Sequence, residues 1–449
     1  MLSPRDWWSC DGQGGRESER PRHATPASAT AWPDVEGFTR RGVLATFGLA
    51  ALAWAMPRTA LSQVAVSPES NGNVLVCVFL RGGLDGLSAV VPYADDDYHR
   101  ARPSLGLGAP NDRNAAGRTL KLSDTFGLSP ALGALMPLYE SRQMAVVHAV
   151  GSRDQTRSHF EAMNAMERGL AAPGEGDASG WLARHLAARP ASTASPLRAV
   201  AFGGVMPDSL RGAPGATAIQ KLEDFRLQTR DAQSARARLG KLYADGTDEM
   251  AVAGRETLSV LDTLNRLDVT GYRPQNRAAY PTTGFGQGLR QAACLIRADV
   301  GLEIASLDMG GWDTHVAQGT AVGWLPTLLQ ELGDSLAAFA QDLGPTMRNV
   351  TISVQTEFGR RVAENAGLGT DHGRGSVMFL IGGGVQGGQV HADWPGLAPE
   401  KLEEPGDLRV TTDYRDVMAE LLSARTPNPA IARVFPGHRP KSLGLIKAS

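Results

Sequence analysis

Five short runs rich in apolar residues put the strongest limit on how this chain can fold. A run that is apolar throughout, as residues 74–80 are, is typical of a strand buried on both faces of a sheet. Segments with helical periodicity separate most of the runs, and this alternation predicts an α/β protein whose central sheet is mostly parallel. The runs are residues 74–80, 144–150, 302–307, 350–356 and 377–381.

Helix start signals mark the segments between these strands. Ser129 and Pro130 begin a helical pattern that continues to residue 142, and Thr411 or Thr412 is placed to cap a helix over 413–424. A longer helix is expected at residues 324–343, with one apolar face turned to the core. That face consists of Leu325, Leu328, Leu329, Leu332, Leu336 and Phe339.

Residues 205–290 differ in character from the rest of the chain. Charged residues recur at helical spacing between positions 233 and 268, and β-forming residues are few there. We therefore expect a helical insertion or cap at 205–290 within a single α/β domain that spans residues 63–449.

Residues 1–62 are expected to be leader and targeting sequence. Residues 1–37 are polar, lack periodicity and predict a disordered leader or an upstream extension from a misplaced start codon. Arg40 and Arg41 then precede an uncharged run at 43–56, so residues 38–62 predict a twin-arginine signal peptide rather than a buried N-terminal helix. The run is too short for a permanent membrane span. We expect the twin-arginine machinery to export the folded chain to the periplasm or the extracellular space.

Charge and cysteine content exclude some classes of function. A formal net charge of -2 gives no electrostatic reason to expect nucleic acid or an anionic membrane surface as a partner. Outside the leader, Cys77 and Cys294 each lie in an apolar run, which predicts two buried free thiols. A disulfide between them is the alternative in an oxidising compartment.

Carboxylates and imidazoles follow the predicted strands where each one ends. Because the carboxyl ends of parallel strands meet at one edge of a sheet, these side chains are expected to converge. Each of them alone has a structural explanation as a cap or turn residue, but the agreement of several loops favours a site. Carboxylates with one or two neutral imidazoles suit Zn²⁺, Mn²⁺, Mg²⁺ or Ca²⁺, and we expect one or two such ions. The candidate ligands are Asp85, Asp313, His315, Glu357, Asp371 and His372.

Thr156, Ser158 and His159 lie where a helix is expected to begin, and we take them as the candidate catalytic residues. Free N–H groups and the dipole at a helix start stabilise an anion such as an alkoxide or a bound oxyanion. The structural alternative makes Thr156 or Ser158 an N-cap and His159 a surface residue. Arginines beside these loops either bind an oxyanion such as phosphate or sulfate or pair with the acids. They are Arg81, Arg157 and Arg360.

Five separated motifs of the mature chain, together with the twin-arginine leader, resemble a known family. The motifs are residues 79–87, 158–162 (Ser-His-Phe-Glu-Ala), 310–315 (Gly-Gly-Trp-Asp-Thr-His), 356–360 (Thr-Glu-Phe-Gly-Arg) and 370–373 (Thr-Asp-His-Gly). They are similar to those of the secreted bacterial family known as domain of unknown function 1501 (DUF1501), across essentially the whole mature chain. The layout is also similar to the alkaline phosphatase superfamily, which includes sulfatases. That similarity implies a three-layer α/β/α sandwich with a two-metal site for phosphoryl or sulfuryl transfer.

The superfamily resemblance implies roles for single residues. Asp85 matches a metal-binding Asp after the first strand, Asp313 and His315 (or Asp308) match ligands from one loop, and His372 matches a late His ligand. Thr156 matches the nucleophile, with Ser158 as the second candidate. Phe358 departs from the pattern, because the superfamily has an Asp-His pair where this chain has Glu357 and Phe358. Phe cannot bind metal, which weakens the case for a second ion, and His391 is a weak replacement.

Two functions follow from these observations. The first is an exported, metal-dependent hydrolase of a small-molecule or polymeric phosphate or sulfate ester, in which Thr156 or Ser158 attacks. The second is a non-catalytic periplasmic or surface protein for binding or assembly that retains the fold with a degenerate metal site. The Asp313/His315 and Asp371/His372 loops favour the first function, and Phe358 favours the second.

Overall fold

The computed structural model describes residues 72–112, 117–174, 178–189, 195–213, 215–426 and 429–447. All of them belong to one unit of the chain. The predicted leader at 1–37 and the predicted export signal at 38–62 lie outside the described residues. Within the described ranges, no helix is both long enough and apolar enough to cross a membrane.

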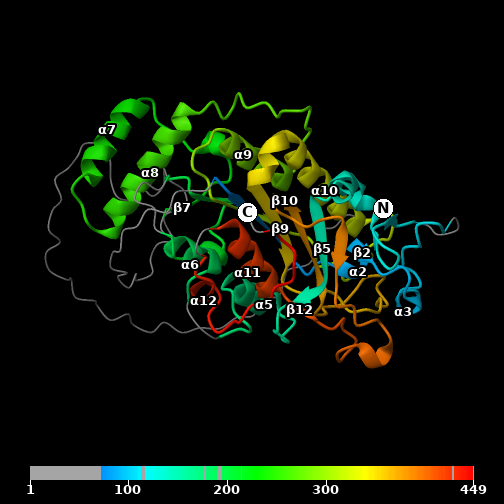
Figure 1. Cartoon of the computed structure of the whole chain (residues 1–449). Helices are drawn as coiled ribbons and strands as arrows, with labels where there is room; N and C mark the ends of the chain where they lie inside the picture. Colours follow the sequence, from blue (N-terminus) through cyan, green and yellow to red (C-terminus); the bar gives the residue numbers. More distant parts are fainter. Residues whose placement is uncertain are drawn as a thin grey trace, which may run out of the picture. The chain divides into compact units, whose positions relative to one another are not determined.

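A sheet forms the centre of the described chain (Figure 1). It has nine strands in the order β11-β5-β10-β9-β1-β8-β6-β7, with β12 paired with β5. Only β10 runs antiparallel to its neighbours, β5 and β9, and the other pairs are parallel. The prediction of a mostly parallel sheet is therefore confirmed. The strands are β1 (Val74–Leu80), β5 (Met144–Gly151), β6 (Ala199–Phe202), β7 (Ala216–Ala218), β8 (Ile304–Met309), β9 (Val350–Thr356), β10 (Ser376–Gly382), β11 (Gln389–His391) and β12 (Thr412–Asp413).

Strand β1 shows why the sheet is covered on both faces. All seven of its residues are buried, and side chains alternate between the faces of a strand. Val74, Val76 and Val78 therefore belong to one hydrophobic core. Leu75 and Cys77 belong to another core on the opposite face.

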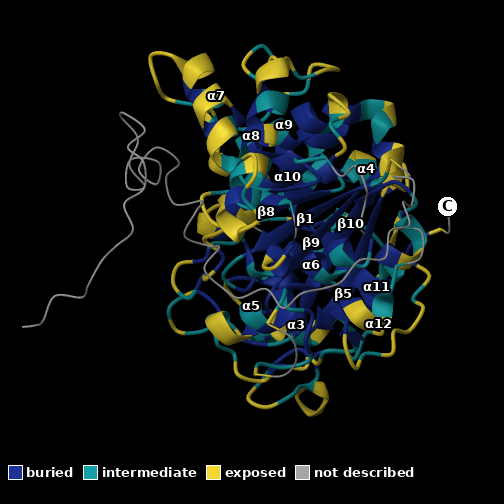
Figure 2. Cartoon of the chain, turned by 90° about the vertical axis from the view of Figure 1, so that its left-hand side faces the viewer, coloured by how far each residue is buried: buried dark blue, intermediate teal, exposed yellow. Residues whose placement is uncertain are grey.

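Helices supply the other side of each core. On the first face lie α9 (Gly284–Arg297) and α10 (Trp324–Leu343), together with the 3-10 helix η2 (Pro130–Leu135). All six apolar residues of the predicted face of α10 are buried. Helices α6 (Trp181–Ala187) and α11 (Tyr414–Arg425) contribute to the second core. Figure 2 shows the buried strands between these two layers, and the predicted three-layer α/β/α class is confirmed.

The range 205–290 contains two helices that pack on each other, α7 (Ala232–Tyr243) and α8 (Glu249–Arg266). Leu239, Leu258 and Leu261 form a small separate core between them. The range also contains the 3-10 helices η3 (Asp208–Leu210) and η4 (Leu222–Asp224) and the strand β7, which joins the main sheet. It is therefore not helical throughout.

Two local predictions are wrong. The expected helix over 129–142 divides into η2 and a short α4 (Met136–Glu140), because Pro137 has no N–H to continue the hydrogen bonding of the preceding turn. The helix α11 is capped by Asp413, whose side chain accepts from Arg415 N, and not by Thr411 or Thr412. Cys77 and Cys294 are buried and free, and they form no disulfide.

Candidate metal centre

The loops that follow β1, β8 and β9 leave the sheet side by side. The last residue of β1, Leu80, lies opposite Met309 of β8 and Thr356 of β9. The loops then approach so closely that Gly82, with a φ of +121°, has no room for a side chain: a Cβ there would lie 2.7 Å from the backbone N of Asp313. Glycine is therefore required where the β1 loop meets the β8 loop.

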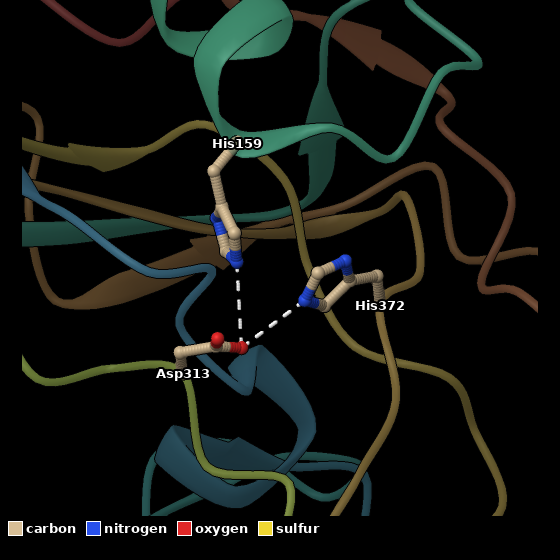
Figure 3. A group of neighbouring side chains, drawn as sticks. All are labelled: His159, Asp313 and His372. Carbon is tan, nitrogen blue, oxygen red and sulfur yellow. Dashed lines mark hydrogen bonds and ion pairs between the residues drawn. The ribbon is translucent and has the colours of Figure 1, made fainter. Parts of the chain in front are cut away.

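Three imidazoles point at one carboxylate oxygen in this region. Nε2 of His315 lies 2.9 Å from Oδ1 of Asp313, and Nε2 of His372 lies 3.1 Å from the same atom. Nε2 of His159, the first residue of α5 (His159–Glu167), is 3.4 Å from it. Figure 3 shows His159 and His372 approaching Asp313 from two sides. We call these four residues the His–Asp cluster. Ligand atoms of His159, Asp313 and His372 lie within 4.8 Å of one another, close enough to hold one metal ion.

The other ring nitrogen of each imidazole contacts an acceptor. Nδ1 of His159 lies 2.7 Å from Oε1 of Glu357, and Nδ1 of His315 lies 3.2 Å from Oδ1 of Asp371. Nδ1 of His372 lies 2.9 Å from the backbone oxygen of Arg157. An acceptor at Nδ1 fixes the tautomer that carries its proton there and turns the Nε2 lone pair toward the centre of the cluster.

One long contact reaches the inward-facing nitrogens from outside the cluster: Nη1 of Arg360 lies 3.4 Å from Nε2 of His315. Nε2 of His315 and Nε2 of His372 are 2.9 Å apart, so two lone pairs face each other unless a proton or a metal ion lies between them. Nε2 of His159 is buried and has no hydrogen-bond partner in the described part of the chain. Three imidazole nitrogens and a carboxylate oxygen form a donor set typical of Zn²⁺ and related divalent ions. The residues present therefore fit such an ion.

Arg360 holds the carboxylate of the cluster in its charged form. Burial alone would raise the pKa of Asp313, but the hydrogen bond and the charge of Arg360 outweigh it and hold the pKa well below its usual range. The buried guanidinium of Arg360 lies 2.6 Å from Oδ1 of Asp313 and also donates to backbone oxygens of Gly82, Gly83, Trp312 and Thr370. Arg360 therefore fixes both the position and the ionisation of Asp313.

The imidazoles differ in their tendency to take up a proton. Burial lowers the pKa of His372, which keeps its ring neutral and able to bind metal. The hydrogen bond to Glu357 raises the pKa of His159 against the opposing effect of burial. A proton and a metal ion therefore compete for Nε2 of His159.

A family model described as "Protein of unknown function (DUF1501)" matches residues 73–440. The chain belongs to this family. A search of the curated proteins finds no match for this DUF1501 protein.

Solved structures similar to this DUF1501 protein include a phosphonate monoester hydrolase and an alkaline phosphatase. The phosphonate monoester hydrolase of Agrobacterium radiobacter is 10% identical over 82% of this chain and 78% of its own, with a TM-score of 0.32. The alkaline phosphatase from the Antarctic bacterium TAB5 is 11% identical over 69% of this chain and 92% of its own, with a TM-score of 0.29. The α/β/α fold of the DUF1501 protein rests on its own strand order and two helical layers.

Asp85, one of the candidate ligands, lies outside the His–Asp cluster. Its carboxylate is fully buried, and both oxygens accept from Arg102, at 2.6 and 2.9 Å. Ser88 and Gln318 also donate to Asp85. Burial would raise the pKa of Asp85, but the charge of Arg102 outweighs it and lowers the pKa. In the DUF1501 protein this carboxylate is thus neutralised by an arginine.

Glu357 and Asp371 lie around the cluster as hydrogen-bond partners of its imidazoles. Oε1 of Glu357 also accepts from Gly82 N, at 2.8 Å, which leaves this buried carboxylate fully engaged. The ring of Phe358 packs 4.7 Å from the ring of His159 and 5.0 Å from that of His372, between centroids. Phe358 therefore forms an apolar wall beside the two imidazoles.

The three candidate oxyanion-binding arginines all pair with acids of the protein. Arg81 bonds Glu167 and lies 2.9 Å from Asp308, the alternative ligand, which belongs to strand β8. Arg157 donates through Nε to Asp407, at 2.8 Å, and Arg360 bonds Asp313 as described above. Of the two roles that the sequence allows for these arginines, binding an oxyanion or pairing with acids, the structure shows the pairing.

The candidate nucleophiles flank a residue that contacts the cluster. Arg157, whose φ is +52°, presents its carbonyl to His372, and Thr156 and Ser158 stand on either side of it. Oγ1 of exposed Thr156 donates to Oδ2 of Asp154, at 2.8 Å, and accepts from Ser158 N. The Ser158 side chain makes no capping bond to α5. His391 lies on the edge strand β11, outside the cluster.

Sequence reasoning missed three contributions to the site. It took His159 as a catalytic residue and did not count it among the ligands, although the Ser158-His159 motif had already drawn attention to it. Arg102 and Gln318, which surround Asp85, carried no signal at all, because neither follows a strand nor belongs to a recognised motif.

Proposed function

We propose that the protein is an exported, metal-dependent hydrolase of phosphate or sulfate esters. The observation that carries the proposal is the convergence of three Nε2 atoms on Oδ1 of Asp313, each from an imidazole whose Nδ1 is held by an acceptor. This arrangement is typical of metal-binding histidines. The ester class follows from the resemblance of the site motifs to the alkaline phosphatase superfamily. Export follows from Arg40, Arg41 and the uncharged run after them.

The metal would be held by His159, Asp313, His315 and His372. A divalent ion bound there supplies a Lewis acid that polarises an ester oxygen. Glu357 and Asp371 orient two of the imidazoles, and Arg360 keeps Asp313 ionised and in place. We propose one ion, because Asp85 is neutralised by Arg102 and Phe358 occupies the neighbouring side.

Oγ1 of Thr156 would attack the phosphorus or sulfur atom and displace the alcohol of the ester, and water would then hydrolyse the ester formed on Thr156. Ser158 is the second candidate for this role. The hydroxyl proton of Thr156 already points to Oδ2 of Asp154, a carboxylate that can accept it as the oxygen becomes nucleophilic. Helix α5, which is nine residues long, begins at His159, three residues after Thr156, and its N-terminus favours negative charge there.

A non-catalytic binding or assembly role is the second candidate. The observation that favours it is Phe358, an apolar ring where related enzymes carry a ligand, together with the withdrawal of Asp85 into an ion pair. In that role the cluster would hold a structural ion without turnover.

Metal content and ester hydrolysis test the proposal on protein expressed from the full-length sequence. We expect about one equivalent of a divalent metal and turnover of an aryl phosphate or aryl sulfate that is lost on chelation. Thr156→Ala should abolish turnover while leaving the metal bound, and Thr257→Ala, in helix α8, is the matched control. Protein that binds no metal would overturn the proposal. Bound metal without hydrolysis of any ester supports the second candidate.

A further inference from the structure

A buried hydrogen-bond network lies behind the His–Asp cluster, and Gln318 is at its centre. The Gln318 side chain is fully buried although it lies in a loop. Its Oε1 accepts from the hydroxyls of Thr314 and Thr370, both at 2.8 Å. Its Nε2 donates to Oδ2 of Asp85, at 2.8 Å, and lies 3.3 Å from Oγ of Ser88. All four polar contacts of one carboxamide are thus made inside the protein.

The partners of Gln318 fix which end of its amide points where. An ionised carboxylate can only accept, so Asp85 must face the NH₂ group. The carbonyl oxygen then faces the two threonines, whose hydroxyls can donate. A carboxamide is the side chain that offers a donor to Asp85 and an acceptor to Thr314 and Thr370 at the same time.

Each threonine adjoins residues of the cluster. Thr314 stands between Asp313 and His315, and Thr370 comes two residues before His372. The backbone N of Thr370 also donates to the backbone oxygen of Thr314, at 3.1 Å. Gln318 therefore joins the two loops that carry three of the four cluster residues.

The network extends to the segment that carries Arg360. Arg102, which pairs with Asp85, donates to the backbone oxygens of Val362, at 2.8 Å, and Arg361, at 3.0 Å. The preceding residue, Arg360, bonds Asp313. Asp85, the negative charge in this network, thus connects Gln318 on one side with Arg102 on the other.

We propose that Gln318 is a positioning residue of the metal centre, which sets the spacing between the Asp313/His315 loop and the His372 loop through its bonds to Thr314, Thr370 and Asp85. The inference rests on the proposed metal site. It assigns Asp85 a new role: with Arg102, it anchors the donor end of Gln318. Loss of Gln318 leaves two hydroxyls and a carboxylate oxygen buried with fewer partners, and the loops then shift to satisfy them.

The test compares metal binding by Gln318→Met and Gln291→Met. Gln291 also bridges two segments, since it accepts from Leu222 N at 2.6 Å, but it lies on helix α9 outside the network. We expect Gln318→Met to weaken the affinity for Zn²⁺ by about 10-fold, the lower end of the loss seen when a direct partner of a metal ligand is removed, because Gln318 acts through Thr314 and Thr370. It should also change the visible spectrum of the Co²⁺-loaded protein. Gln291→Met should lower the melting temperature without changing either readout.

A second pair of variants tests whether Gln318 positions the metal ligands or only stabilises the fold. Gln318→Glu places a carboxylate against Asp85 and should weaken Zn²⁺ binding further. Asp85→Asn keeps the shape of the side chain, but both oxygens of Asp85 accept from Arg102, so an NH₂ group then faces a donor. This variant should also weaken Zn²⁺ binding and change the Co²⁺ spectrum.

The outcomes distinguish this inference from the proposed function. Wild-type protein that binds no Zn²⁺ overturns both. Wild-type protein that binds Zn²⁺, with Gln318→Met binding it equally well and with the same Co²⁺ spectrum, overturns the role of Gln318 alone. Zn²⁺ binding and a Co²⁺ spectrum that Asp85→Asn leaves unchanged overturn the role given to Asp85.

Discussion

Replacing Glu357 by Gln tests whether the outer partners of the cluster serve a metal ion. Oε1 of Glu357 accepts from Gly82 N, and it lies 2.7 Å from Nδ1 of His159. Gln has the same shape and keeps a carbonyl oxygen for both donors. The NH₂ group of the new side chain then takes the place of Oε2 of Glu357, which lies 2.9 Å from Oγ1 of Thr356. The fold should therefore survive, while the imidazole loses its ionised partner.

The expected loss follows from the effect of such partners on metal affinity. Removing one typically costs about 10–100-fold, or about 1.4–2.7 kcal/mol. A metal present at about 100 times its dissociation constant adds about 2.7 kcal/mol to the free energy of unfolding. After a roughly 30-fold loss of affinity the same metal concentration adds only about 0.9 kcal/mol.

The assay is urea unfolding of wild-type and variant protein, each with and without Zn²⁺. The difference between the two metal-induced stabilisations should be about 2 kcal/mol. Glu303→Gln is the control, because Glu303 pairs with Arg198 and Arg189 and contacts no member of the cluster. It should lower stability equally with and without metal. Equal metal-induced stabilisation in wild type and Glu357→Gln would refute the role assigned to Glu357.

Two further predictions concern the acid stability of the fold and the geometry of the β1 loop. Burial lowers the pKa of His148 to about 4, so as pH falls the unfolded chain takes up this proton first. The free energy of unfolding, measured with urea, should then fall between about pH 6.5 and pH 4, by up to about 1.4 kcal/mol per pH unit. His148→Gln should lack this part of the fall, and an equal pH dependence in wild type and variant would contradict the prediction. Gly82→Ala would put a Cβ 2.7 Å from Asp313 N, and it should abolish Zn²⁺ binding in a titration. The control is Gly437→Ala, which is also at positive φ but has nothing within 4 Å, and it should lower the free energy of unfolding without changing Zn²⁺ binding. Zn²⁺ binding retained by Gly82→Ala would show that the loop contact is not required.

Local sequence patterns determined the elements of the fold. Residues 324–343 carry one continuous apolar face, and the helix found there has those bounds. Residues 74–80 and 350–356 are buried strands as expected. These elements follow from the spacing of apolar residues, which depends only on neighbours a few positions away. The break at Pro137 was missed because the apolar pattern continues across it.

The sequence also placed Asp313, His315 and His372 in loops that the sheet brings to one edge. It did not decide what each charged group would bind. Glu357 contacts His159, which lies 198 positions away in the sequence, and Asp85 accepts a hydrogen bond from Gln318, which lies 233 positions away. Whether a carboxylate binds a metal, an arginine or an imidazole depends on which distant segments cross at its position, and no local pattern contains that information.

The strand order and the loop contacts therefore decided the composition of the centre. They bring His159 close to Asp313 and to its hydrogen-bond partner Glu357. They also bring Asp85 into contact with Arg102 and Gln318. The physical reason is that hydrogen bonds and ion pairs act over about 3–4 Å. Residue types in a sequence state which interactions are possible, and only the packed chain brings a particular pair within that distance.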